Sequence, residues 1–81
     1  MKRYFYTTVK FDKSNEDVMK KINLNLDIDK LEKDGSYKIS YSGNIKSGTG
    51  YEESVIKGTR NFLNRIGFSR GTYEVIKVEE R

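Results

Sequence analysis

The sequence predicts one α+β domain spanning residues 1–81, in which a four-stranded, mainly antiparallel sheet carries one main helix on one face. Three observations support this fold class. In residues 3–11 and 22–29 apolar side chains alternate with others, which is the period of a strand. Residues 51–66 instead place their apolar side chains at helical spacing. At 81 residues and without cysteine, the chain has room for one modest core that hydrophobic packing must stabilise.

The first strand is predicted over residues 3–11, where aromatic and β-branched side chains are frequent and Phe5 marks the side facing the core. The segment after it allows a short helix, because Ser14 followed three residues later by Asp17 resembles a helix N-cap. If residues 15–21 are helical and pack on the sheet, the order becomes a ferredoxin-like βαββαβ sandwich. This alternative ranks second, because a connection of about ten residues is near the lower limit for a parallel crossover.

A second and a third strand are predicted to form an antiparallel hairpin. Residues 22–29 alternate strictly between apolar and polar types, and a helix would scatter their apolar side chains around its circumference. Asp34 and Gly35 then form a turn signal, since both residue types tolerate positive φ. Alternation resumes beyond the turn at Tyr37, Ile39 and Tyr41.

The main helix is predicted over residues 51–66, with acidic residues in its first turn and Arg65 in its last. Gly67 stands where a left-handed C-terminal cap is expected. A final strand follows Gly71, and its apolar residues leave open which side faces the core. The glycine-rich loop Gly48–Thr49–Gly50 before the helix is expected to be flexible and to end in a Ser or Thr cap rather than to bind an anion.

The composition argues against catalysis and against a cofactor. Histidine and cysteine, which supply most proton transfers and thiol nucleophiles near neutral pH, are both absent, so we predict a protein that is not an enzyme. Asp27 and Asp29 share the polar side of the second predicted strand, but alternating acids are typical of a solvated strand face, and no metal site is predicted. No signal peptide or membrane span is recognisable, which predicts a cytoplasmic protein without membrane contact.

Positive charge is concentrated on the main helix and the turn after it. The net charge is +4, and residues 54–73 contain four basic residues and no acid. Arginine and lysine contact phosphates, while asparagine can bond to the backbone or to base edges. The sequence therefore predicts a small accessory protein that binds nucleic acid through one set of residues: Lys57, Arg60, Asn61, Asn64, Arg65 and Arg70.

The alternative hypothesis is a small regulator or inhibitor that binds a partner protein, as compact proteins of mobile elements often do. Its contact surface would be an exposed strand edge or the sheet face that bears Tyr4, Tyr6 and Lys10. Acids of the neighbouring predicted strand, Asp27 and Asp29, would share that face and disfavour a phosphate backbone there. An exposed edge strand would also permit a homodimer under either hypothesis.

Overall fold

The computed structural model describes residues 2–45 and 50–81. Within them the chain forms three strands, two α-helices and one short 3₁₀ helix. In chain order these are β1 (Arg3–Phe11), α1 (Glu16–Asn25), η1 (Ile28–Lys30), β2 (Ser36–Gly43), α2 (Tyr51–Arg65) and β3 (Tyr73–Glu80). The α+β character predicted from the sequence is confirmed.

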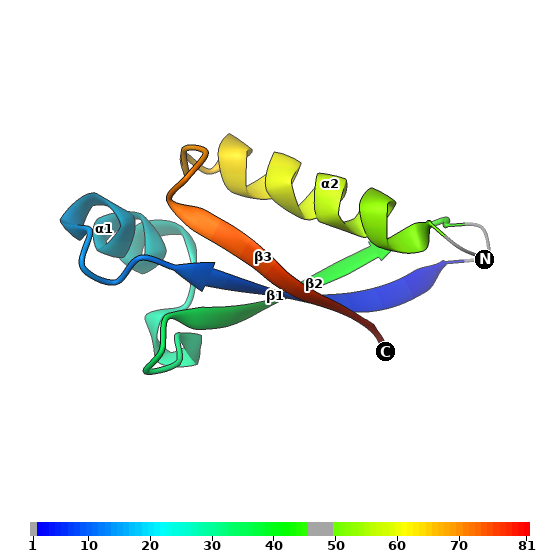
Figure 1. Ribbon diagram of the computed structural model, residues 1–81, viewed down its shortest axis with the longest axis horizontal. Helices are drawn as coiled ribbons and strands as arrows, with labels where there is room; N and C mark the ends of the chain where they lie inside the picture. Colours follow the sequence, from blue (N-terminus) through cyan, green and yellow to red (C-terminus); the bar gives the residue numbers. More distant parts are fainter. Residues whose placement is uncertain (1, 46–49) are drawn as a thin grey trace.

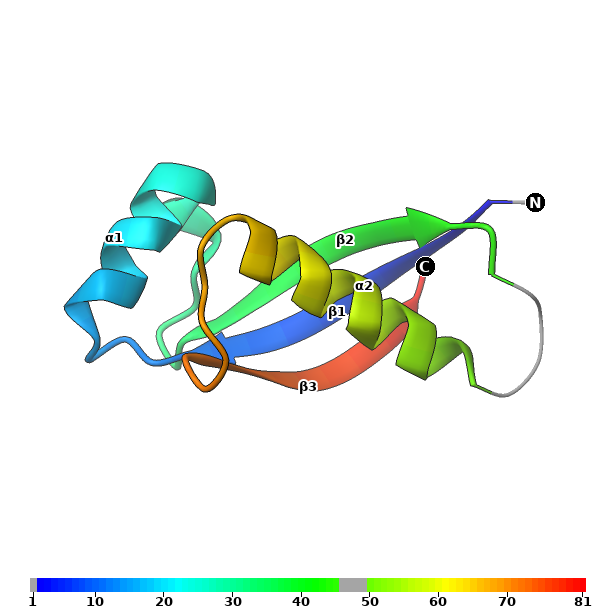
Figure 2. The same ribbon diagram turned by 90° about the horizontal axis from the view of Figure 1, so that it is seen from above.

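The sheet has the order β2-β1-β3, and β1 pairs antiparallel with both neighbours. The two outer strands are therefore parallel to each other, and α2 is the crossover that joins them. Figure 1 shows α2 lying over one face of the sheet and α1 beyond one end of it. Figure 2, seen from above, shows α2 running across the three strands. Among the described residues, no α-helix covers the opposite face, and η1 borders one end of it.

The core lies between α2 and the sheet and continues under α1. The odd-numbered residues of β1 from Phe5 to Phe11 are buried, and the side chains of Val55 and Leu63 on α2 pack toward them. Val18 and Ile22 extend the same apolar cluster to α1. Full burial of such side chains contributes about 1.5–3 kcal/mol each, which makes this cluster the main stabilising element.

Two close contacts fix α2 on the sheet. The hydroxyl oxygens of Thr7 on β1 and Thr59 on α2 lie 3.0 Å apart in a buried hydrogen bond. Gly58 faces the ring of Tyr41, and a Cβ at Gly58 would lie 2.3 Å from that ring's Cε2 atom. Only glycine therefore allows Tyr41 to approach the helix so closely without a shift of the ring.

The predicted strand over residues 22–29 is wrong, because this segment is the second half of α1 followed by η1. Ile22 is fully buried in α1, but Leu24 is 82% exposed. The helix instead buries Val18 and Ile22, one turn apart, with Leu26 packed against the same cluster. Helical spacing thus accounts for the buried residues, and alternation of apolar types was a coincidence of the local sequence.

The four-stranded sheet and the hairpin are wrong for the same reason, and so is the ferredoxin-like alternative, which also needs four strands. The helix proposed over residues 15–21 is real and longer than expected. Its N-cap is Asn15, whose side-chain oxygen accepts from the amides of Asp17 and Val18. Ser14, the expected cap, instead donates its hydroxyl to Asp12.

The main helix is confirmed, with α2 ending at Arg65 and Gly67 adopting a φ of 107° just beyond it. At the other end the N-cap is Gly50, with a φ of 94° and no side-chain cap, so the expected Ser or Thr cap is wrong. The rest of the glycine-rich loop that was expected to be flexible, residues 48–49, lies outside the described residues. Neither α2 nor any other described helix is long and apolar enough to cross a membrane.

A bulge in β3 resolves which side of the last strand faces the core. Val75 pairs with Val9, whereas Lys77 pairs with the preceding β1 residue, Thr8, so Ile76 is an extra residue. An extra residue resets the alternation of a strand. Val75 and Val78 therefore share the core side although they are three positions apart, and Ile76 stays 54% exposed.

Candidate nucleic-acid interface

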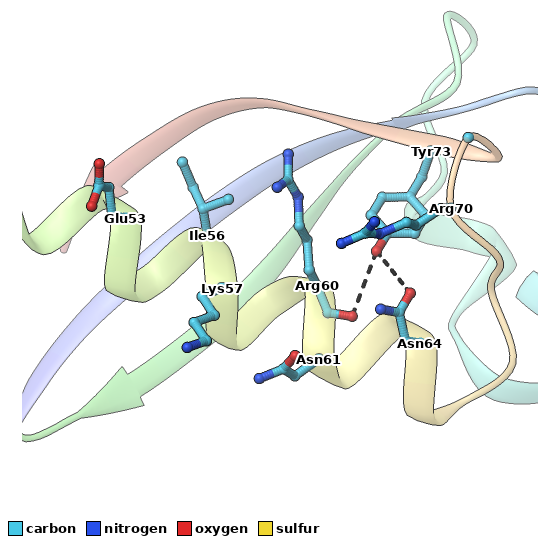
Figure 3. A pocket seen from close by; sticks show the side chains of 9 residues that line it. Glu53, Ile56, Lys57, Arg60, Asn61, Asn64, Arg70 and Tyr73 are labelled. Atoms are coloured by element: carbon cyan, nitrogen blue, oxygen red, sulfur yellow. Dashed lines mark hydrogen bonds between the residues drawn. The ribbon is translucent and has the colours of Figure 1, made fainter.

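A groove of about 760 Å³ runs between the outer surface of α2 and the start of β3. Its side chains come from α2 and from the turn that leads into β3, as Figure 3 shows. The polar and basic lining residues are Lys57, Arg60, Asn61, Asn64, Arg70 and Tyr73. Five of the six residues predicted from the sequence are thus brought into one groove.

Helix periodicity and a tight turn assemble this surface. Lys57, Arg60, Asn61 and Asn64 follow at spacings of three, one and three residues, which places them along one side of α2 away from the core. Arg70 joins them because the chain reverses at Gly67 and again at Gly71, both with positive φ. The four α2 side chains and Arg70 are all exposed to solvent.

Tyr73 forms part of the groove wall and was missed by the sequence analysis. Its hydroxyl donates to Asn64 Oδ1 at 3.0 Å and also lies 3.5 Å from the carbonyl oxygen of Arg60. Burial raises the pKa of Tyr73 above its ordinary value, although Arg60 and Arg70 act in the opposite direction. The phenol therefore stays protonated at neutral pH and orients the Asn64 side chain. The sequence did not predict it, because the last strand left open which of its side chains face the core.

The cations of the groove are not neutralised by neighbouring carboxylates. In the described part of the chain, the ion pairs involve Arg3, Lys21, Lys38 and Lys77 but neither Lys57, Arg60 nor Arg70. Glu53, at the far end of the groove, is the one acid among the described residues that line it. Three cations against one carboxylate give a positive groove that is open to solvent.

Arg65 does not join this groove. It lines a different depression, of about 400 Å³, on the β2 side of α2, together with Tyr41 and Phe62. The five-residue separation from Arg60 places the two arginines on different sides of the helix. The predicted six-residue set is therefore divided between two depressions: five residues line the groove, and Arg65 lines the other depression, which it shares with Asn61.

The tyrosine-bearing surface is where the sequence placed it, but its surroundings differ. Tyr4, Tyr6 and Lys10 occupy the sheet face opposite α2, and Tyr4 is 50% exposed. The predicted acidic neighbours do not lie on a paired strand, because Asp27 caps η1 and Asp29 lies within it, and η1 borders only one end of that face. The actual neighbour on this side is β2, which pairs Ser40 and Ser42 with the two tyrosines.

No metal-binding cluster of three or more His, Cys, Asp or Glu side chains occurs among the described residues. Asp27 accepts a hydrogen bond from the amide of Asp29 at 3.0 Å, which is the contact of a helix cap. Comparisons with protein-family models, with curated proteins and with solved structures gave no significant match to this chain.

Proposed function

We propose that this protein is a non-catalytic accessory protein that binds nucleic acid through the groove between α2 and β3. Lys57, Arg60 and Arg70 contact phosphates, and Asn61 and Asn64 add hydrogen bonds to the backbone or to bases. One observation carries the proposal: the three cations share a groove, and none of them has an ion-pair partner among the described residues.

The arrangement suits a phosphate backbone, because cationic side chains that neutralise phosphates release the counterions condensed on the nucleic acid. Each neutralised phosphate contributes about 0.9 to the slope of log affinity against log salt on duplex DNA, and about 0.7 on a single strand. Three contacts therefore give a slope of roughly −2 to −3. This value predicts binding that is measurable at low salt and weak near physiological salt.

The test is fluorescence anisotropy of labelled single- and double-stranded DNA and RNA at several salt concentrations. Arg60→Ala combined with Arg70→Ala is expected to weaken binding and to lower the salt slope by about 2. The matched control is Lys20→Ala combined with Lys30→Ala, which removes the same charge from exposed positions outside the groove. Circular dichroism establishes that each variant is folded.

The proposal fails if the arginine variant binds as tightly as the control variant. It also fails if the wild-type chain binds none of the four nucleic acids at low salt. The remaining hypothesis would then be a partner protein bound through the Tyr4 and Tyr6 face or through a strand edge, because a buried aromatic contact is little weakened by salt.

A further inference from the structure

We propose that the sheet face opposite α2 is a second nucleic-acid contact, on which unpaired bases stack, so that the protein prefers single strands to duplexes. The inference rests on the proposed function, since it assigns a strand type to the same ligand. It concerns a separate surface, because the basic groove lies on the α2 side of the sheet and this platform on the other.

The register of the sheet leaves the two tyrosine rings accessible. Tyr4 lies opposite Ser42 and Tyr6 opposite Ser40, so the β2 neighbours on this face are small. Tyr4 is half exposed and Tyr6 partly so. A base can therefore lie flat on the Tyr4 ring without displacing a large side chain of β2. Aromatic rings on an open sheet are the usual platform for single-stranded bases.

Cations lie over the faces of these rings at cation–π distance, so a stacking base displaces the Arg81 guanidinium, which is then available to an adjacent phosphate. The guanidinium carbon of Arg81 is 4.7 Å from the Tyr6 centroid and 6.0 Å from the Tyr4 centroid. The Arg81 backbone amide donates to the Tyr4 carbonyl at 2.9 Å, which holds this residue beside the platform. Lys38 Nζ lies 5.8 Å from the Tyr6 centroid on the β2 side.

The charge balance favours an anion as the occupant. Pairing across the sheet places Lys38 and Lys77 opposite Thr8, and Lys10 two positions further along β1. The acids of β3 on this face are Glu74 and Glu79, and the Glu79 carboxylate already lies 3.7 Å from Lys77 and 4.0 Å from Lys38. Asp34 lies near Lys10, and Glu32 lines the same depression as Lys38, so that end of the face carries little net charge. Beside the two rings, Lys38, Lys77 and Arg81 oppose the carboxylate of Glu79. Exposed rings with this local positive charge are complementary to a single-stranded polyanion.

The experiment compares a single-stranded oligothymidine of twelve nucleotides with a duplex of equal length, using the intact chain. Tyr4→Leu keeps an apolar side chain and removes the ring, whereas Tyr4→Phe keeps the ring. The expected result is a loss of about 5- to 150-fold in affinity of Tyr4→Leu for the single strand, which is the value of one stacked base. Duplex binding should be unchanged, and Tyr4→Phe should behave as wild type.

A spectroscopic signal separates stacking from indirect effects. A base stacked on Tyr4 should quench the intrinsic tyrosine emission, which is readily measured because the chain has no tryptophan. The quenching should be reduced in Tyr4→Leu and retained in Arg60→Ala combined with Arg70→Ala, at saturating single strand. Equal single-strand affinity of Tyr4→Leu and Tyr4→Phe would overturn the platform while leaving the groove proposal intact. A wild-type chain that binds neither oligonucleotide would overturn both proposals.

Discussion

The buried hydroxyl pair between Thr7 and Thr59 gives the sharpest prediction about stability. Both residues are at most 1% exposed, and their oxygens are 3.0 Å apart. Thr59→Val preserves shape but leaves the Thr7 hydroxyl without this partner. A buried polar group that loses its hydrogen bond costs about 1–3 kcal/mol. For a domain of this size each kcal/mol lowers the melting temperature by roughly 4–8 °C.

The double variant separates the hydrogen bond from packing. Thr7→Val combined with Thr59→Val removes both hydroxyls. The double variant should therefore lose less free energy of unfolding than the two single variants lose together, by at least about 1 kcal/mol. Urea denaturation followed by circular dichroism measures all four chains of the cycle. The conclusion that this bond joins α2 to β1 would be refuted if the losses in free energy of unfolding were additive. It would also be refuted if the single variants unfolded with a free energy within about 0.3 kcal/mol of wild type.

Three further predictions follow from other contacts. Gly58→Ala should destabilise the protein by up to about 2 kcal/mol, because crowding against Tyr41 outweighs the gain of about 1 kcal/mol in helix propensity. In a Tyr41→Ala background the same change should stabilise the protein in the same urea assay. Asn15→Ala should lower the free energy of unfolding by about 1 kcal/mol through loss of the α1 cap; a neutral effect would contradict the capping geometry. Hydrogen bonding by Arg3 lowers the pKa of Glu80 below its ordinary value of 4.5, so this carboxylate stabilises the fold above pH 4.5 and the contribution is lost as pH falls through the lowered pKa. Glu80→Gln should therefore reduce the melting temperature at pH 7 more than at pH 3, and an equal reduction at both would argue against it.

The sequence predicted most elements correctly and one segment wrongly. The strands β1 and β2 and the helix α2 have clear periodicity, whereas β3 was placed by its β-branched residues after Gly71 with its core side left open. Residues 22–29 carry two periods at once, because Ile22 and Leu26 satisfy both alternation and a helical turn. The deciding signal lay upstream, in the N-cap at Asn15 and the apolar Val18 one turn before Ile22.

The candidate groove was largely predictable because it depends on one helix. Residues at helical spacing share a side wherever the helix packs, so four α2 members of the groove followed from the sequence alone. Tyr73 did not, because the bulge at Ile76 changes the phase of β3 and only strand pairing reveals it. The cations around the tyrosine platform were missed for a similar reason. Lys38 and Lys77 meet only after two distant strands pair with β1.

The central position of β1 has a consequence for how the chain folds. Its pairing with β3 joins distant segments, as in the Arg3–Glu80 contact between residues 77 positions apart. Long-range pairing of this kind slows folding, because the loop must close before the contacts form. During synthesis β1 can pair with β2 well before β3 has left the ribosome. Until β3 arrives, the second edge of β1 can pair with strands of other chains. At high expression levels we therefore expect aggregation of incomplete chains to precede misfolding within single chains.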